Sequence, residues 1–194
     1  MEQYIKKFFQ ELENKINEVS WKEIAQAIKI LQSTYENGGW VYLIGNGGSA
    51  AVASHFANDL NKTILGHKGD KKAKRFQAIS LSDNIPVLTA WANDVGFEAV
   101  FSEQLKNFAQ EKDALVAISS SGKSKNIIQA VETAKSFHLP VIGLMGFDGG
   151  DLLPLSDAKI HVPSFSYAIV ESAHDAICHL ITTYFEESIK DESQ

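Results

Sequence analysis

From residue 40 onward, short apolar runs alternate with glycine- or serine-rich turns and with stretches of helical periodicity. This alternation constrains the fold more than any other feature of the chain. The apolar runs predict strands at 40–44, 76–80, 114–118, 141–145 and 160–162. Helices are predicted between them, up to about residue 60, at 84–110 with a break near 93–96, at 125–137 and at 168–187. Buried strands separated by helices indicate an α/β fold with a doubly wound, five-stranded parallel sheet. In such folds ligands bind beyond the carboxyl ends of the strands.

The first 36 residues carry apolar side chains at helical spacing, which predicts two helices or one bent helix. Ile5, Phe8, Phe9 and Leu12 form an apolar stripe that a single helix cannot bury by itself. We therefore expect residues 1–36 to be a helical extension that packs on a partner subunit. Residues 37–194 are expected to form the α/β domain, and the two parts together make one structural unit.

Composition and charge exclude several classes of function. The chain has 194 residues, 44% hydrophobic and 22% charged, which fits one globular domain. A net charge of −6 argues against a nucleic-acid partner, apart from a local basic segment at 68–75. No apolar run reaches the roughly 20 residues that span a bilayer, so no membrane partner is expected. The single cysteine, Cys178, excludes an internal disulfide and favours the cytoplasm. Residues 66–74 are expected to form a polar surface loop.

A hydroxyl-rich segment, SSSGKS at 119–124, follows the strand predicted at 114–118 and leads into a helix. Unpaired backbone N–H groups and the helix dipole favour an anion at such a turn. Serine and glycine also serve there as ordinary N-caps. The density of hydroxyl groups favours phosphate, and the spacing of a P-loop or a dinucleotide fingerprint is absent. A phosphate monoester on a small molecule is therefore the ligand that suits this segment.

Two helices each carry imidazole and carboxylate groups at a spacing of four residues, which places them on one helix face. The residues are His55 and Asp59 on the first helix, and Glu171, Asp175 and His179 on the last. The first helix follows a glycine-rich turn at 45–49, where a ligand can approach the backbone closely. Such pairs are most often surface contacts. If the helices meet, they offer N and O ligands for zinc, or a carboxylate base and an imidazole acid.

In five ordered blocks the chain resembles the sugar isomerase (SIS) family, and within it the phosphoheptose isomerases. The blocks are 45–51 with 55–60, 92–98 with 101–102, 118–124, 146–150 and 171–179. The resemblance implies the SIS fold and a homotetramer with active sites between subunits. It also implies isomerisation of sedoheptulose 7-phosphate to a glycero-manno-heptose 7-phosphate, through an enediol. The product is expected to serve the synthesis of cell-surface sugars, such as lipopolysaccharide or capsule heptose, or of secondary-metabolite sugars. The alternative is a non-catalytic SIS module that binds a phosphosugar or a partner protein.

The resemblance further implies roles for particular residues. Phosphate binding falls on Ser119, Ser121 and Ser124, with help from Ser120. Contacts to the sugar fall on Asn46, Gly47, Gly48, Ser49, Asn93, Asp94 and Glu171. The metal ligands fall on His55, Asp59, Glu171 and His179, which implies one zinc ion per subunit. Proton transfer falls on Asp59, Glu171 and His179.

The chain departs from the family pattern at four positions, two of them among these site residues and two close to Glu171. Asp59 stands where the family has glutamate, and Glu171 stands where it has glutamine. Either carboxylate is therefore a candidate for the base. Ile169 replaces an arginine, and Tyr167 replaces a small polar residue, so sugar recognition is expected to differ.

Overall fold

The computed structural model describes residues 1–65 and 74–192, so that all of the predicted polar loop except Lys74 lies outside the described residues. The helices are α1 (Glu2–Asn17), α2 (Trp21–Glu36), α3 (Gly48–Asn61), α4 (Ile85–Asp94), α5 (Ser102–Phe108), α6 (Lys125–Ser136), α7 (Leu152–Leu155) and α8 (Tyr167–Glu192). Short 3₁₀ turns lie at Thr63–Leu65 and Phe97–Ala99. The strands are β1 (Trp40–Ile44), β2 (Gln77–Ser80), β3 (Ala114–Ser119), β4 (Val141–Met145) and β5 (Ala158–His161).

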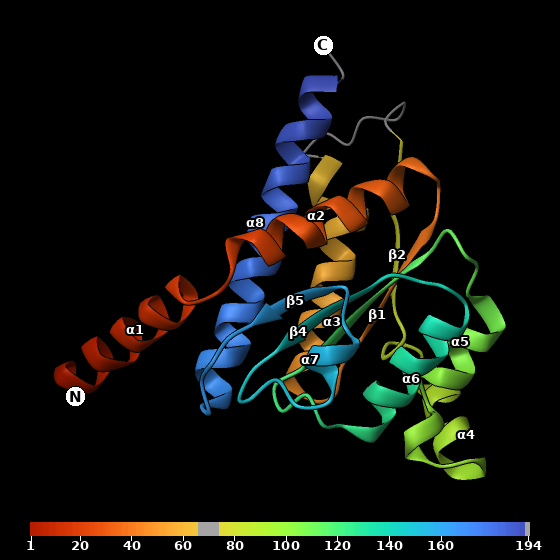
Figure 1. Cartoon of the computed structure of the whole chain (residues 1–194), viewed down its shortest axis with the longest axis horizontal. Helices are drawn as coiled ribbons and strands as arrows, with labels where there is room; N and C mark the ends of the chain where they lie inside the picture. Colours follow the sequence, from red (N-terminus) through yellow and green to blue (C-terminus); the bar gives the residue numbers. More distant parts are fainter. Residues whose placement is uncertain (66–73, 193–194) are drawn as a thin grey trace.

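The five strands pair in parallel in the order β2-β1-β3-β4-β5, which confirms the doubly wound α/β sheet. Successive side chains of a strand point to opposite faces, and both faces are apolar. In β1, Val41 and Leu43 join the core beneath α2, α3 and α8, whereas Tyr42 and Ile44 join the core beneath α5, α6 and α7. The result is a sheet covered by helices on both sides (Figure 1).

The strand order creates a crevice at the carboxyl edge of the sheet. The chain leaves β1 toward β2 on one side and later enters β3 on the other side of β1. The carboxyl ends of β1 and β3 lie close together, because Ile44, the last residue of β1, pairs with Ala117, two residues before the end of β3. The segments that follow these two strands therefore start side by side and lead to opposite faces, which is the arrangement that forms ligand sites in open α/β sheets.

The two N-terminal helices differ in how they contact the domain. Helix α2 packs on the sheet, with Ala27 and Leu31 fully buried. Helix α1 has no buried residue and projects from the body of the molecule (Figure 1). Its exposed residues include Tyr4 and Phe9. Within the predicted extension 1–36, α2 thus belongs to the domain core, whereas α1 touches it only through half-buried residues such as Leu12 and Ile16 and through contacts with α8. That α1 contacts another subunit stays a prediction.

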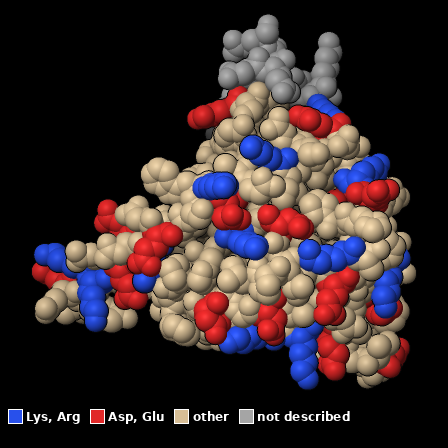
Figure 2. All heavy atoms as spheres, viewed as in Figure 1, with Lys and Arg blue, Asp and Glu red and all other residues tan. Residues whose placement is uncertain are grey.

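The surface carries charges of both signs. Figure 2 shows Lys and Arg side chains interspersed with Asp and Glu side chains over one face, in keeping with the modest net charge of −6. Across residues 1–65 and 74–192, no helix combines the length and the apolar character that a membrane span needs.

His174 on α8 is fully buried, and in the described part of the chain neither ring nitrogen has a well-aligned hydrogen-bond partner. Burial disfavours the charged ring and lowers the pKa of His174 to about 4; the charge of His161 lowers it further, and the nearby backbone of Met145 offsets part of the effect. In the unfolded chain the imidazole of His174 has an ordinary pKa near 6.5. As the pH falls, His174 is therefore protonated at a higher pH in the unfolded chain than in the folded chain.

Folding stability is accordingly expected to fall as the pH drops from about 6.5 toward 4. Protonation of His174 should lower the free energy of unfolding by on the order of 3 kcal/mol over this pH range. The variant His174→Met should not show this loss. The measurement is the free energy of unfolding by urea at pH 7 and pH 4. His138→Asn is the matched control, because His138 is exposed and Asn tolerates its positive φ of 61°. An equal pH dependence in His174→Met and in the unmodified chain would contradict the expectation.

Candidate active site

The two segments predicted to approach a ligand meet at the carboxyl edge of the sheet. They border a cavity of about 120 Å³ between β1, β3 and the start of α8. Its lining residues are Asn46, Ser49, Ile118, Ser119, Ser120, Ser121, Ser124, Tyr167 and Glu171. The structure thus brings together all four serines predicted to bind phosphate and three residues predicted to contact the sugar, namely Asn46, Ser49 and Glu171.

The serine loop, residues 119–124, is ordered by its own hydroxyl groups. Ser119 Oγ accepts a hydrogen bond from the Gly122 N–H at 3.2 Å, and Ser121 Oγ accepts one from the Lys123 N–H at 3.3 Å. Ser124 occupies the N-cap position of α6, but its hydroxyl makes no capping bond within the described structure. Ordinary capping therefore explains only part of this hydroxyl cluster.

Ser120 offers the clearest sign of a polar ligand. The residue is 5% exposed, and no partner for its Oγ exists among the described residues. A buried hydroxyl without a partner costs free energy, because it has given up its hydrogen bonds to water. A bound oxyanion in the cavity that Ser120 lines would satisfy this hydroxyl.

The glycine-rich segment at 146–150 and the residues that follow it support the serine loop through backbone contacts. Ser120 O accepts a hydrogen bond from Gly146 N, and Gly122 O accepts one from Leu152 N, both at 3.0 Å. Gly122 has φ +65°, and a Cβ there would lie 2.0 Å from Gly149 O, so only glycine fits this contact. Lys123 turns away to pair with Asp148 at 2.8 Å. Backbone packing therefore fixes the shape of the loop.

Asn126 is a residue that the sequence analysis missed. It is buried on α6, and its amide exchanges two hydrogen bonds of 2.9 Å with the amide of Asn46. Its Oδ1 also accepts from the Ile127 N–H. The pair ties the turn after β1 to the helix after the serine loop. No local pattern marks Asn126 in the sequence, because its partner is 80 residues away.

Glu171 lies in the serine cavity, on the first turns of α8. A Cβ at Gly48 would lie 2.4 Å from Glu171 Oε2, so the carboxylate presses against the start of α3 where only glycine leaves room. Gly47, the preceding residue, has φ +53°, which also favours glycine. The glycines of this turn thus let a carboxylate from α8 reach the phosphate-binding side of the site.

A second cluster lies farther along α8, where this helix packs against α3. His55, Asp175 and His179 each offer a donor atom, and these atoms all lie within 4.8 Å of one another. Asp175 Oδ1 lies 3.3 Å from His55 Nδ1, and Asp175 Oδ2 lies 3.9 Å from His179 Nδ1. The two rings meet edge to face, 4.9 Å between centroids. Imidazole nitrogens and carboxylate oxygens suit a divalent transition metal, so this His-Asp-His group can hold a metal ion.

Asp59 lies on the other side of both rings and is only 5% exposed. Its Oδ2 is 3.7 Å from His55 Nε2 and 3.7 Å from His179 Nε2. Its Oδ1 accepts a 2.8 Å hydrogen bond from Thr63 Oγ1. Of the four predicted metal ligands, the structure therefore places His55, Asp59 and His179 together. Glu171 is not part of the group, and Asp175 is the carboxylate that joins it.

Two of the predicted sugar contacts, Asn93 and Asp94, do not line the cavity. Asn93 and Asp94 are exposed on α4, where Asn93 Nδ2 donates to Asp94 Oδ1 at 2.7 Å. Ile169, which stands in the place of an arginine, is buried, whereas Tyr167 lines the cavity. A tyrosine at the mouth of the site thus takes part in shaping it.

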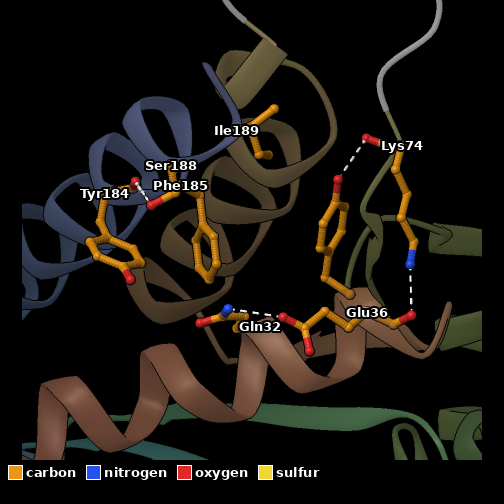
Figure 3. Close-up of a pocket in the computed structure, with 8 residues that line it drawn as sticks. Gln32, Glu36, Lys74, Tyr184, Phe185, Ser188 and Ile189 are labelled. Atoms are coloured by element: carbon orange, nitrogen blue, oxygen red, sulfur yellow. Dashed lines mark hydrogen bonds between the residues drawn. The ribbon is translucent and has the colours of Figure 1, made fainter. Parts of the chain in front are cut away.

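Another hollow, of about 260 Å³, lies near the amino ends of the strands, between α2, α8 and the start of β2 (Figure 3). Its lining residues are Gln32, Tyr35, Glu36, Lys74, Tyr184, Phe185, Ser188 and Ile189. Its polar groups bond to one another: Lys74 Nζ donates to Glu36 O, and Gln32 Nε2 donates to Glu36 Oε1. None of the predicted site residues lines this hollow, which separates it from the chemistry at the other edge.

Comparison with known proteins gives consistent matches over nearly the whole chain. A family model described as the SIS domain matches residues 3–146. The phosphoheptose isomerase of Leptospira biflexa is 39% identical over 166 residues, covering 86% of this chain and 84% of that protein. A phosphoheptose isomerase structure from Francisella tularensis has a TM-score of 0.85 at 33% identity and covers 96% of both chains. The phosphoheptose isomerase GmhA from Neisseria gonorrhoeae has a TM-score of 0.84 at 29% identity, covering 96% of this chain and 98% of that one.

Proposed function

Because the chain belongs to the SIS domain family, we propose that it is a phosphoheptose isomerase that converts sedoheptulose 7-phosphate to glycero-manno-heptose 7-phosphate. One observation carries the proposal: the carboxylate of Glu171 and the serine loop line the same cavity. A group that can move a proton thus lies beside a group that can anchor a phosphate. We further propose that the product supplies heptose for cell-surface sugars, in the cytoplasm.

The serine loop binds the phosphate of the substrate in this proposal. The lining residues include four serine hydroxyls and no lysine or arginine among those that the structure describes. Hydroxyl groups, backbone N–H groups and the N-terminus of α6 therefore hold the negative charge, as helix N-termini do in other phosphate sites. This remote anchor positions the reacting carbon atoms, so that binding energy is used for orientation.

Glu171 acts as the base and His179 as the acid. Aldose–ketose isomerisation moves a proton between carbons 1 and 2 through an enediol, which requires a base at carbon and an acid at the carbonyl oxygen. Glu171 shares the cavity with the phosphate anchor, whereas both oxygens of Asp59 already face other protein groups. His179 is eight residues farther along α8, about 12 Å at 1.5 Å per residue. The carbon chain would lie along this helix.

The zinc ion proposed for this site would be held by side chains of the imidazole–carboxylate cluster around His55 and His179. When bound, it supplies a positive charge that stabilises negative charge on the substrate oxygens. Asp59 orients the two imidazoles from their buried side.

The proposed homotetramer, with sites between subunits, rests on two features of the single chain. The apolar stripe of α1 is exposed at Ile5 and Phe9, and the neighbouring Tyr4 is exposed as well. The predicted sugar contacts Asn93 and Asp94 lie outside the cavity of their own chain, so another subunit would have to bring them to it.

The test is an assay with sedoheptulose 7-phosphate, following formation of the aldose with and without added zinc. We expect turnover with the phosphorylated sugar and much less with sedoheptulose, because phosphate-free sugar cannot use the serine loop. His179→Ala is the inactive control. Phosphosugar binding without turnover, unchanged by His179→Ala, would instead favour the alternative of a non-catalytic binding module.

A further inference from the structure

We propose that Asn126 is a positioning residue for the isomerisation, which sets the orientation of the Asn46 amide at the wall of the serine cavity. Asn46 lines this cavity, whereas Asn126 is 2% exposed and is not among its lining residues. Asn126 therefore acts through Asn46 and not on the substrate. The inference rests on the proposed function, in which Asn46 contacts the sugar.

The two amides form a reciprocal pair. Asn46 Nδ2 donates to Asn126 Oδ1, and Asn126 Nδ2 donates to Asn46 Oδ1, both at 2.9 Å. Turning one amide over without the other would bring an NH₂ group against an NH₂ group and an oxygen against an oxygen. The orientation of Asn46 therefore follows that of Asn126.

A backbone group decides between the two orientations that the pair could adopt together. The Ile127 N–H donates to Ser124 O and also to Asn126 Oδ1, both at 3.0 Å. If the Asn126 amide were turned over, its NH₂ group would face this N–H, and two donors would meet. The start of α6 thus fixes the Asn126 amide, and through it the amide of Asn46.

This fixed orientation determines what Asn46 offers to a sugar. An amide has two N–H groups and two oxygen lone pairs, and the pairing with Asn126 uses one of each. One N–H and one lone pair remain, on different edges of the Asn46 amide. A carbonyl oxygen of the substrate can only accept a hydrogen bond, so a reversed amide would present the wrong group to it.

The pair also connects the two ends of the proposed site. Asn46 belongs to the turn between β1 and α3, and Asn126 lies in the first turn of α6, two residues after Ser124. The two residues are 80 positions apart in the chain and meet across the crevice. The sugar contact is thereby held at a set distance from the serine loop. Reactions that depend on orientation are sensitive to displacements of about 1 Å in such a contact.

The experiment is a double-mutant cycle on the full-length protein, with kcat and KM measured for sedoheptulose 7-phosphate. Asn126→Ala is expected to lower kcat by about 10- to 100-fold and to change KM by less than about threefold, because the phosphate anchor remains. Asn46→Ala should lose at least as much. In the Asn46→Ala background, adding Asn126→Ala should change kcat by no more than about threefold, because the amide that Asn126 orients is already absent.

Inorganic phosphate, used as a competitive inhibitor, shows whether the serine loop keeps its shape. Its inhibition constant should stay within about threefold of the unmodified value in Asn126→Ala. A structural defect of α6 would raise this constant, because Ser124 begins the same helix. The phosphate measurement therefore separates a misplaced Asn46 from a distorted loop.

A second variant keeps the test independent of the folding of Asn126→Ala. Asn126→Asp retains the oxygen that faces the Ile127 N–H and loses the donor to Asn46 Oδ1. We expect the same fall in kcat, which again disappears in the Asn46→Ala background. Asp113→Asn is the matched control, because it weakens buried 2.8 Å hydrogen bonds to Trp40 and Gln110 before β3, at the opposite edge of the sheet. It should lower Tm and leave kcat unchanged.

Two results would overturn the inference while the unmodified protein is active. One is a further loss of kcat from the Asn126 variants in the Asn46→Ala background, equal to their loss in the unmodified background. The other is a parallel rise in KM and in the inhibition constant of phosphate, which would mean that Asn126 only supports the serine loop. Absence of turnover by the unmodified protein would instead overturn the proposed function, and this inference with it.

Discussion

Replacing Glu171 by glutamine is expected to lower kcat by about 10²- to 10⁴-fold and to change KM little, the range typical of a lost general base. Glutamine keeps the shape that fits against Gly48 and keeps the lining of the cavity. It cannot accept the proton from carbon. Steady-state kinetics with sedoheptulose 7-phosphate measure the loss in kcat. Incorporation of deuterium from D₂O into the sugar measures the loss of proton abstraction from carbon.

Asp59→Asn is the informative comparison, because the sequence left both carboxylates open as the base. Asp59 is buried, accepts a hydrogen bond from Thr63 and faces both histidines. Its amide variant is therefore expected to lose activity together with zinc content, and Glu171→Gln should lose activity with its zinc intact. Full deuterium exchange in Glu171→Gln, with exchange abolished in metal-loaded Asp59→Asn, would assign the base to Asp59 instead.

Ser120→Ala is expected to lower kcat/KM by about 10- to 150-fold, since a hydrogen bond to a charged group contributes about 1.5–3 kcal/mol. The stability of the free protein should stay unchanged or rise, because the hydroxyl is buried and has no partner among the described residues. This combination, a loss in catalysis without a loss in Tm, is the signature of a group held ready for a ligand. Kinetics and thermal unfolding of the same preparation measure both.

Ser156→Ala is the matched control for Ser120→Ala. Ser156 is also buried, but its Oγ donates a 2.8 Å hydrogen bond to Leu152 O. It should lose about 1 kcal/mol of stability with unchanged kinetics. The effect of Ser120→Ala should also vanish with phosphate-free sedoheptulose. An equal loss with both sugars would mean that Ser120 does not contact the phosphate.

The order of strands and helices could be predicted from the sequence because it depends on local patterns. Short apolar runs predicted all five strands, four of them to within one residue at each end. The short helix α7 was missed, since Leu152–Leu155 is too brief for helical periodicity to appear. The fifth strand, predicted at 160–162, lies at Ala158–His161, because Ala158 and Lys159 pair with β4 despite their modest β propensity.

The composition of the site was predicted in part. The serine loop and the glycine turn stood out because phosphate binding at a helix N-terminus leaves a local mark in the sequence. Asn126 left no such mark, since its role depends on Asn46 across the crevice. Asp175 showed the right spacing, but the resemblance pointed to Glu171, and spacing alone does not tell which turn of a helix faces which neighbour.

The sequence by itself determined the elements, the two ligand-binding turns and the set of imidazoles and carboxylates, because each depends on residues close together in the chain. The tertiary structure alone decided how they combine. The strand order placed the serine loop beside the glycine turn, and the packing of α8 on α3 brought His179 to His55. Residues four apart on a helix differ by about 40° in direction, so neighbours along α8 can serve different parts of one site. Glu171 therefore reaches the serine cavity, and Asp175, one turn later, reaches the histidines.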